Sequence, residues 1–183
     1  MSKTTTIQAA VLAACLSAVS YANAAGMITK ADYRAGKDAA TATYKADKEA
    51  CDKLGDNAKD VCMAEAKAKE KVAKAELEYK YTGKAGDRKH LADVKAETAY
   101  EVAKEKCDDK AGNDKDVCVK EAKAVETKAK ADAKLNKEVG DASKDAVDDK
   151  MDANYKVAKE KCDALSGDAK SSCMDNAKMH YKK

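Results

Sequence analysis

The stretch Y-E-V-A-K-E-K-C-D-D-K-A-G-N-D-K-D-V-C-V-K-E-A-K-A, residues 100–124, occurs three times in the chain with small changes. The earlier copy, residues 44–68, reads Y-K-A-D-K-E-A-C-D-K-L-G-D-N-A-K-D-V-C-M-A-E-A-K-A. The later copy, residues 155–179, reads Y-K-V-A-K-E-K-C-D-A-L-S-G-D-A-K-S-S-C-M-D-N-A-K-M. Such a nearly constant period, roughly 55 residues, predicts a protein built from repeats of one supersecondary unit.

Each copy contains two cysteines with ten residues between them. Cys51 would lie in the last turn of a helix that ends near Gly55, and Cys62 in the second turn of the next helix. In an antiparallel hairpin these two positions face each other, as a disulfide requires. Zinc sites favour cysteine ligands two to four residues apart, and redox sites favour the C-x-x-C motif. The gap of ten residues fits these two kinds of site less well than it fits a disulfide. We therefore predict three disulfides: Cys51–Cys62, Cys107–Cys118 and Cys162–Cys173.

Glycine marks the expected helix ends, because it accepts the left-handed conformation that follows a helix C-terminus. Five glycines recur at an almost regular spacing of half a repeat, each near an Asp or Asn that can cap the next helix: Gly55, Gly83, Gly112, Gly140 and Gly167. We predict an all-α fold of six helices, in three disulfide-stapled antiparallel hairpins at residues 25–82, 83–139 and 140–183. The hairpins form either an up-and-down bundle or a jointed rod, since Gly83 and Gly86 fit a hinge or a tight turn.

The composition favours long helices with a small core. Ala, Lys and Glu are strong helix formers, and the chain has no Pro, Phe or Trp. One expected apolar seam contains Cys118, Ala122, Val125, Ala129 and Val139. Tyrosines seven residues before a cysteine are expected to pack on the partner helix: Tyr44, Tyr100 and Tyr155. Acid–base pairs four residues apart are expected to support the helices: Glu49–Lys53, Glu65–Lys69, Glu76–Lys80, Glu126–Lys130 and Asp152–Lys156.

The charge pattern argues against several classes of function. The 36 Lys and Arg residues nearly balance the 33 Asp and Glu residues, so there is no basic excess for binding nucleic acid. The Asp pairs at 108–109 and 148–149 lack the alternating ligands of a calcium loop. His90 and His180 lie far apart among charged residues. With no phosphate loop, nucleophile elbow or metalloprotease motif, we expect no enzyme activity, cofactor or metal site.

Residues 1–24 have the form of a secretory signal peptide. An apolar run at residues 7–19 is too short for a membrane span, and Ala22-Asn23-Ala24 fits a signal-peptidase site. The alternative is a lipoprotein, because Leu12-Ala13-Ala14-Cys15 is similar to a lipobox and would place a lipid anchor on Cys15. Either form implies export to the periplasm or beyond, where disulfides are the expected state of the six other cysteines.

The repeated phrase Y-K-x-A-K-E-K-C-D-x-L-x-G-D-A-K-x-x-C, followed by E-A-K-A in two copies, resembles small exported proteins of Gram-negative bacteria labelled TolA-like or cell-envelope proteins. The resemblance covers nearly all of the chain after residue 24. It implies a periplasmic location and an association with the envelope. The Ala/Lys/Glu-rich composition is also similar to that of late-embryogenesis-abundant stress proteins, which usually lack cysteine.

Together these features predict a non-enzymatic periplasmic protein with a structural or protein-interaction role, and an envelope protein as its partner. The first alternative is a stress-protective or chaperone-like helical protein, because high charge and a small core leave helices dynamic. The second, less favoured alternative is a metal buffer that uses carboxylates and thiols.

Overall fold

The computed structural model describes residues 27–182, in which the regular elements are all helices. The predicted all-α class is confirmed, whereas the predicted signal peptide and Cys15 lie outside the described residues. The helices are α1 (Lys30–Cys51), α2 (Asp56–Thr82), α3 (Ala85–Cys107), α4 (Gly112–Asp163) and α5 (Gly167–Tyr181). Within the described range, no helix is both long enough and apolar enough to cross a bilayer.

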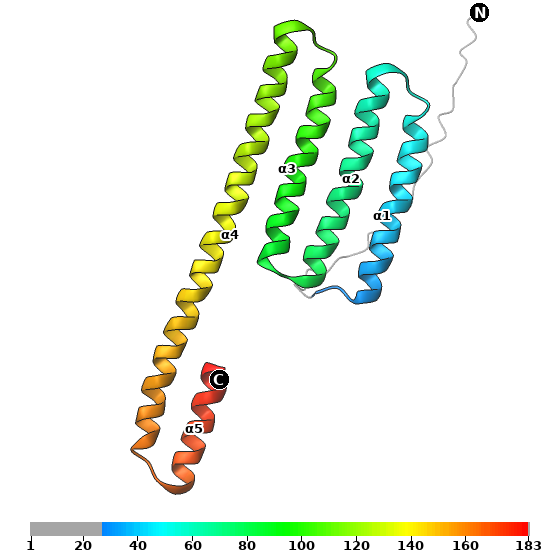
Figure 1. The fold of residues 1–183 in the computed structure, drawn as a ribbon. Helices are drawn as coiled ribbons and strands as arrows, with labels where there is room; N and C mark the ends of the chain where they lie inside the picture. The colour runs from blue at the N-terminus through cyan, green and yellow to red at the C-terminus, as the bar shows by residue number, and fades with distance from the viewer. Residues whose placement is uncertain (1–26, 183) are drawn as a thin grey trace, which may run out of the picture.

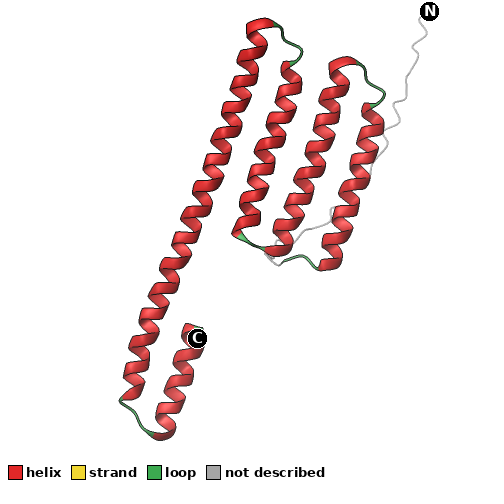
Figure 2. Ribbon diagram, viewed as in Figure 1, coloured by secondary structure: helices red, strands yellow, loops and turns green. Residues whose placement is uncertain are grey.

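Consecutive helices pack side by side and form a single layer. α1 contacts α2, α2 contacts α3, α3 contacts α4, and α4 contacts α5; the described helices make no other pairwise contacts. Figure 1 shows α1, α2, α3 and the N-terminal half of α4 in one row, with the chain reversing direction at each turn. The C-terminal half of α4 extends beyond this row, and α5 lies back against it (Figure 2).

A disulfide closes three of the four turns between helices. Cys51–Cys62 joins α1 to α2, Cys107–Cys118 joins α3 to α4, and Cys162–Cys173 joins α4 to α5, with Cα–Cα distances of 5.5, 5.8 and 5.6 Å. The first cysteine of each pair is only 1% exposed. Because these cysteines are the largest fully buried side chains among the described residues, the disulfides themselves form the centre of these three turns.

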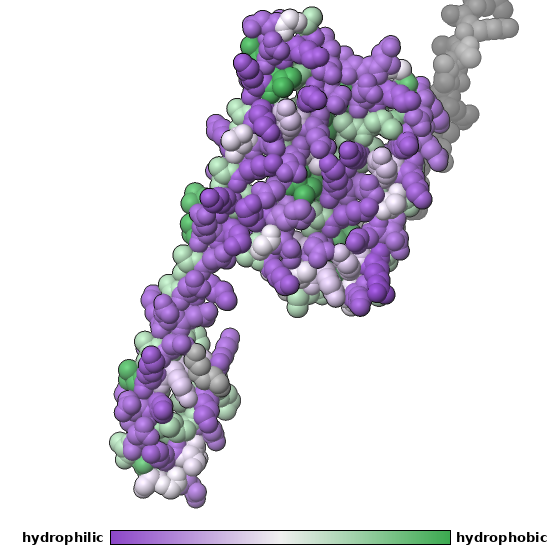
Figure 3. All heavy atoms as spheres, viewed as in Figure 1, coloured by the Kyte–Doolittle hydropathy of each residue, from purple (hydrophilic) through white to green (hydrophobic). Residues whose placement is uncertain are grey.

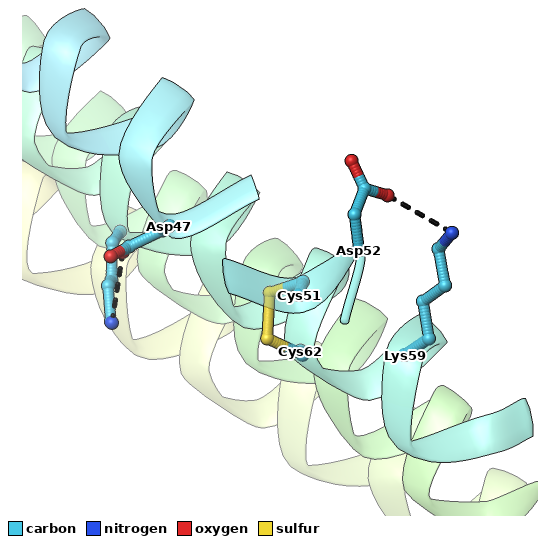
Figure 4. Close-up of a disulfide and its surroundings, with 6 residues drawn as sticks. Asp47, Cys51, Asp52, Lys59 and Cys62 are labelled. Atoms are coloured by element: carbon cyan, nitrogen blue, oxygen red, sulfur yellow. Dashed lines mark hydrogen bonds and ion pairs between the residues drawn. A yellow bond between two sulfur atoms is a disulfide. The ribbon is translucent and has the colours of Figure 1, made fainter. Parts of the chain in front are cut away.

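An ion pair that the sequence analysis missed lies beside every disulfide. The aspartate that follows the first cysteine contacts a lysine seven residues later, as Figure 4 shows for Asp52 and Lys59. The Nζ–O distances are 3.0 Å for Lys59–Asp52, 3.0 Å for Lys115–Asp108 and 2.9 Å for Lys170–Asp163. The hydrogen bond from Lys170 lowers the pKa of Asp163. The repeated D-x6-K spacing was the available signal in the sequence.

The six-helix prediction is wrong, because α4 continues through Gly140 for 52 residues. Gly83, where α2 ends, has a left-handed φ of 65°, and its N–H donates to the carbonyl of Tyr79. Gly140 is not among the residues with positive φ. The ion pair Lys137–Asp141, at 2.5 Å, spans the glycine and supports the helix there. One glycine costs a helix about 1 kcal/mol, which is too little to end it among strong helix formers.

The core between the helices consists of small side chains. Within residues 27–182 the buried apolar residues are three cysteines and five alanines: Cys51, Ala66, Ala75, Ala96, Cys107, Ala133, Cys162 and Ala177. Close approach of the helices accompanies this composition: a Cβ added at Gly36 of α1 would lie 2.7 Å from Leu77 of α2. The layer therefore depends on close backbone packing instead of large interdigitating side chains.

Substituting Gly140→Ala is expected to stabilise the protein by about 0.5–1 kcal/mol, because the added methyl meets nothing within 4 Å and alanine favours the helix. Gly83→Ala is the matched control and is expected to destabilise it, since its φ of 65° strains an L-residue. Urea unfolding measures both changes. A loss of stability in Gly140→Ala as large as in Gly83→Ala would show that α4 breaks at Gly140.

Removing one disulfide by the paired substitution Cys107→Ala and Cys118→Ala is expected to lower the free energy of unfolding by about 3 kcal/mol. The physical reason is that the closed loop, with a sequence separation of 11, no longer restricts the unfolded chain. Urea unfolding without reductant measures the change. An unchanged unfolding midpoint would contradict the structural role given to the disulfide.

Candidate interaction surface on helix α4

Helix α4 has a series of exposed hydrophobic side chains. Six of its large apolar residues are 44–64% exposed: Val117, Val125, Leu135, Val139, Val147 and Val157. Isolated exposed valines are ordinary on protein surfaces, but several on one helix mark a candidate contact surface. The predicted seam is wrong in part, because Val139 is 56% exposed; Val125 lines the groove between α3 and α4 as predicted but is itself 64% exposed.

The arrangement of the neighbouring helices leaves one edge of α4 open. Figure 1 shows α3 and α5 along the same side of α4, at its two ends. Between them, residues 142–150 are all exposed. Hydrophobic residues appear in Figure 3 along the free edge of α4, where it leaves the four-helix row. α4 therefore uses one side for its own chain and presents the other side to solvent.

A shallow apolar groove lies between α3 and α4. Its volume is about 450 Å³, and it is lined mainly by alanines of the two helices together with Tyr100 and Val125. The Nζ atom of Lys123 lies 4.8 Å from the centre of the Tyr100 ring. Alanine leaves this space because its side chain is short, so the groove follows from the same composition that brings the helices close.

Glu126 is the one buried acidic residue in the described part of the chain, at 5% exposure, and it lies at the edge of the groove. Lys123 and Lys130 donate to its two carboxylate oxygens at 2.6 and 2.8 Å. These hydrogen bonds lower the pKa of Glu126. Lys130 also contacts Glu97 of α3 at 2.7 Å, so the cluster ties α3 to α4. Of the five predicted acid–base pairs, Glu126–Lys130 is therefore present.

The other residues that the sequence singled out do not gather in one place. Tyr44, Tyr100 and Tyr155 are half-buried, and the Tyr155 ring lies 6.2 Å from that of Tyr181 on α5. His90 and His180 are both exposed, on α3 and α5. His90 lies in an open polar groove formed by α1, α2 and α3.

No three His, Cys, Asp or Glu side chains within residues 27–182 are grouped so that they could hold a metal ion. Each of the six predicted site cysteines in that range is part of a disulfide. In this state their sulfur atoms are not available as thiolate ligands.

The chain matches no protein-family model, no curated protein and no solved structure. The resemblance to TolA-like envelope proteins therefore stays a prediction. A proposal for the function therefore rests on the exposed apolar surface of α4 and on the three disulfide turns.

The buried carboxylate predicts a specific dependence of stability on pH. The pKa of Glu126 is lower in the folded chain than its usual value of about 4.3, so its contribution is full above that pH and is lost as pH falls through the folded pKa. Glu126→Gln is expected to lower the free energy of unfolding by about 1–2 kcal/mol at pH 7. It is also expected to flatten the loss of stability in acid.

Urea unfolding at pH 7 and at several values down to pH 3 measures this effect. The exposed Glu138, which contacts Lys134 only at 3.8 Å, provides the matched control variant Glu138→Gln. The role given to Glu126 would be contradicted if the two variants had equal free energies of unfolding at pH 7 and lost stability equally as the pH falls.

Proposed function

We propose that this protein is a non-enzymatic helical repeat protein of the periplasm, which binds or spaces components of the cell envelope through the exposed surface of α4. The observation that carries the proposal is the long helix itself. Its 52 residues span roughly 78 Å, and its apolar edge is not used by the protein's own helices.

The location proposed here rests on the cysteines and the N-terminal sequence. Three disulfides within one chain are typical of an oxidising compartment. The signal-like residues 1–24 favour export. In the Gram-negative cell that the family resemblance implies, these two features together favour the periplasm.

The proposed mechanism is positioning and not covalent chemistry. The disulfide turns fix neighbouring helices, and α4 holds the α5 end of the protein away from the four-helix row. A partner that packs on the free edge of α4 would bury side chains such as Leu135 and Val157, each more than half exposed. Burial of apolar area at about 25 cal/mol per Å² would supply the binding energy.

Photo-crosslinking in cells tests this role. A benzophenone amino acid at position 135 is expected to give adducts with envelope proteins, identified by mass spectrometry. Lys134, which is 70% exposed but points about 100° away around the helix, provides the control position. Equal labelling from both positions, or no adduct with an envelope protein from position 135, would contradict the proposal.

A second candidate role is protection of other proteins under stress. The observation that favours it is the small core, in which the buried apolar residues of the described range are alanines and cysteines. Helices with so little burial open easily and expose apolar surface. In this role the protein would slow the aggregation of an unfolded client, measured by light scattering. No slowing at a tenfold molar excess would exclude it.

A further inference from the structure

The contact between α2 and α3 shows how one repeat packs on the next. Glu65 of α2 contacts Lys106 of α3 at 2.7 Å, and Glu76 contacts Lys95 at 2.8 Å. The two glutamates are separated along α2 by the same number of residues as the two lysines along α3, but the lysines come in the opposite order. The two helices therefore pack antiparallel in a defined register. Ala75 is buried on α2 within this contact region.

Each of these four charged residues has a counterpart on α4, at the equivalent position of the next repeat. When the first two repeats are aligned on their second cysteines, Glu65 corresponds to Glu121 and Glu76 corresponds to Asp132. When the last two repeats are aligned on their first cysteines, Lys106 corresponds to Lys161 and Lys95 corresponds to Lys150. All four keep their sign. The third ion pair of the α2–α3 contact, Lys71–Glu101, is not kept, since its counterparts are Thr127 and Lys156.

In this chain the counterpart charges cannot meet, because one continuous helix holds them apart. Glu121 and Lys161 lie roughly 60 Å from each other along the helix axis. All four charged residues are exposed. Within residues 27–182 none of the four has an ion-pair partner, whereas their equivalents on α2 and α3 do.

The surface between these charges has the apolar character of a helix contact. Ala131, the counterpart of the buried Ala75, is exposed, as is Ala153, the counterpart of the buried Thr98. The exposed small and apolar residues of this face follow one another mostly at intervals of three, four and seven: Ala124, Ala131, Leu135, Val139, Ala142, Ala146, Ala153 and Val157. Such intervals form one stripe along a helix, as in a coiled-coil seam.

We propose that a second copy of this chain packs antiparallel along the free edge of α4, with the N-terminal half of each α4 against the C-terminal half of the other. Glu121 and Lys161 lie equally far from Asp141 on its two sides, and so do Asp132 and Lys150. Both pairs therefore share one centre, as a two-fold axis requires. Each pair forms twice across the dimer.

This dimer reproduces the contact between repeats, but between chains. At each end of the dimer, the row formed by α1, α2, α3 and the N-terminal half of α4 of one copy is extended by two helices of the other copy. These are the C-terminal half of its α4 and its α5. Because α3 and α5 lie on the same side of α4 (Figure 1), the free edge accepts the second copy without displacing either helix. The exchange of an equivalent element between chains is domain swapping, and here the uninterrupted helix at Gly140 causes it.

Sedimentation velocity of the full, oxidised protein tests the proposal, with Glu121→Lys plus Asp132→Lys as one variant and Lys150→Glu plus Lys161→Glu as the other. Each variant alone is expected to dimerise at least tenfold more weakly than the natural sequence, because all four ion pairs become repulsive. An equimolar mixture is expected to form heterodimers, since every pair is again opposite in sign. Glu138→Lys plus Asp145→Lys, on the same helix but outside these pairs, is the control for net charge.

A natural chain that stays monomeric at 100 µM would overturn the proposal, and so would variants whose mixture does not associate. Carbodiimide crosslinks between Glu121 and Lys161 within a monomer would also overturn it, because they require α4 to fold back at Gly140. The inference rests on the interaction role of α4 proposed above and names a second copy as its partner. The two proposals fail separately: a monomer that still gives adducts with envelope proteins from position 135 would overturn the dimer alone, whereas a dimer whose position 135 links only to the second copy would overturn the envelope role alone.

Discussion

The disulfide across each turn is the constraint on which the rest of this structure depends. The chain buries alanine and cysteine where most proteins bury Leu, Ile and Phe, so the hydrophobic contribution of each helix contact is small. A covalent link that closes a short loop lowers the entropy of the unfolded chain without needing a large core. The adjacent Asp–Lys ion pair holds the same turn from the outside, as Figure 4 shows. Once a turn is fixed, two alanine-rich helices are held close enough for many weak contacts.

Away from the turns, the layer is held by charge pairs between helices. The link between α2 and α3 has no disulfide and relies on three ion pairs with a thin line of small residues. Among the described helices, contacts exist only between consecutive ones, so each unit is stabilised by its neighbours, as in other repeat proteins. The α4 helix contacts two helices, α3 and α5, but both lie on the same side of it, so its other side is open. The proposed interaction role and the proposed dimer both use this open side.

The sequence predicted the parts of the structure that depend on local spacing. Ten residues between cysteines, and helix formers on either side, were enough to predict the helices and the disulfide turns. Gly140 misled the prediction, because a glycine permits a left-handed turn without requiring one, and Gly83 and Gly140 differ only in their surroundings. Glu65 and Glu76 were assigned lysines on their own helix, but they pair with Lys106 and Lys95 of the next one. Val139 was placed on the inner seam because periodicity identifies a stripe but not the side on which a partner lies.

Peptide mapping of the protein without reduction, after free thiols have been alkylated, tests the central claim most directly. The account predicts three linked peptide pairs, one within each repeat: Cys51 with Cys62, Cys107 with Cys118, and Cys162 with Cys173. None of these six cysteines should be alkylated. Alkylated cysteines among the six, or links that join one repeat to another, would contradict it.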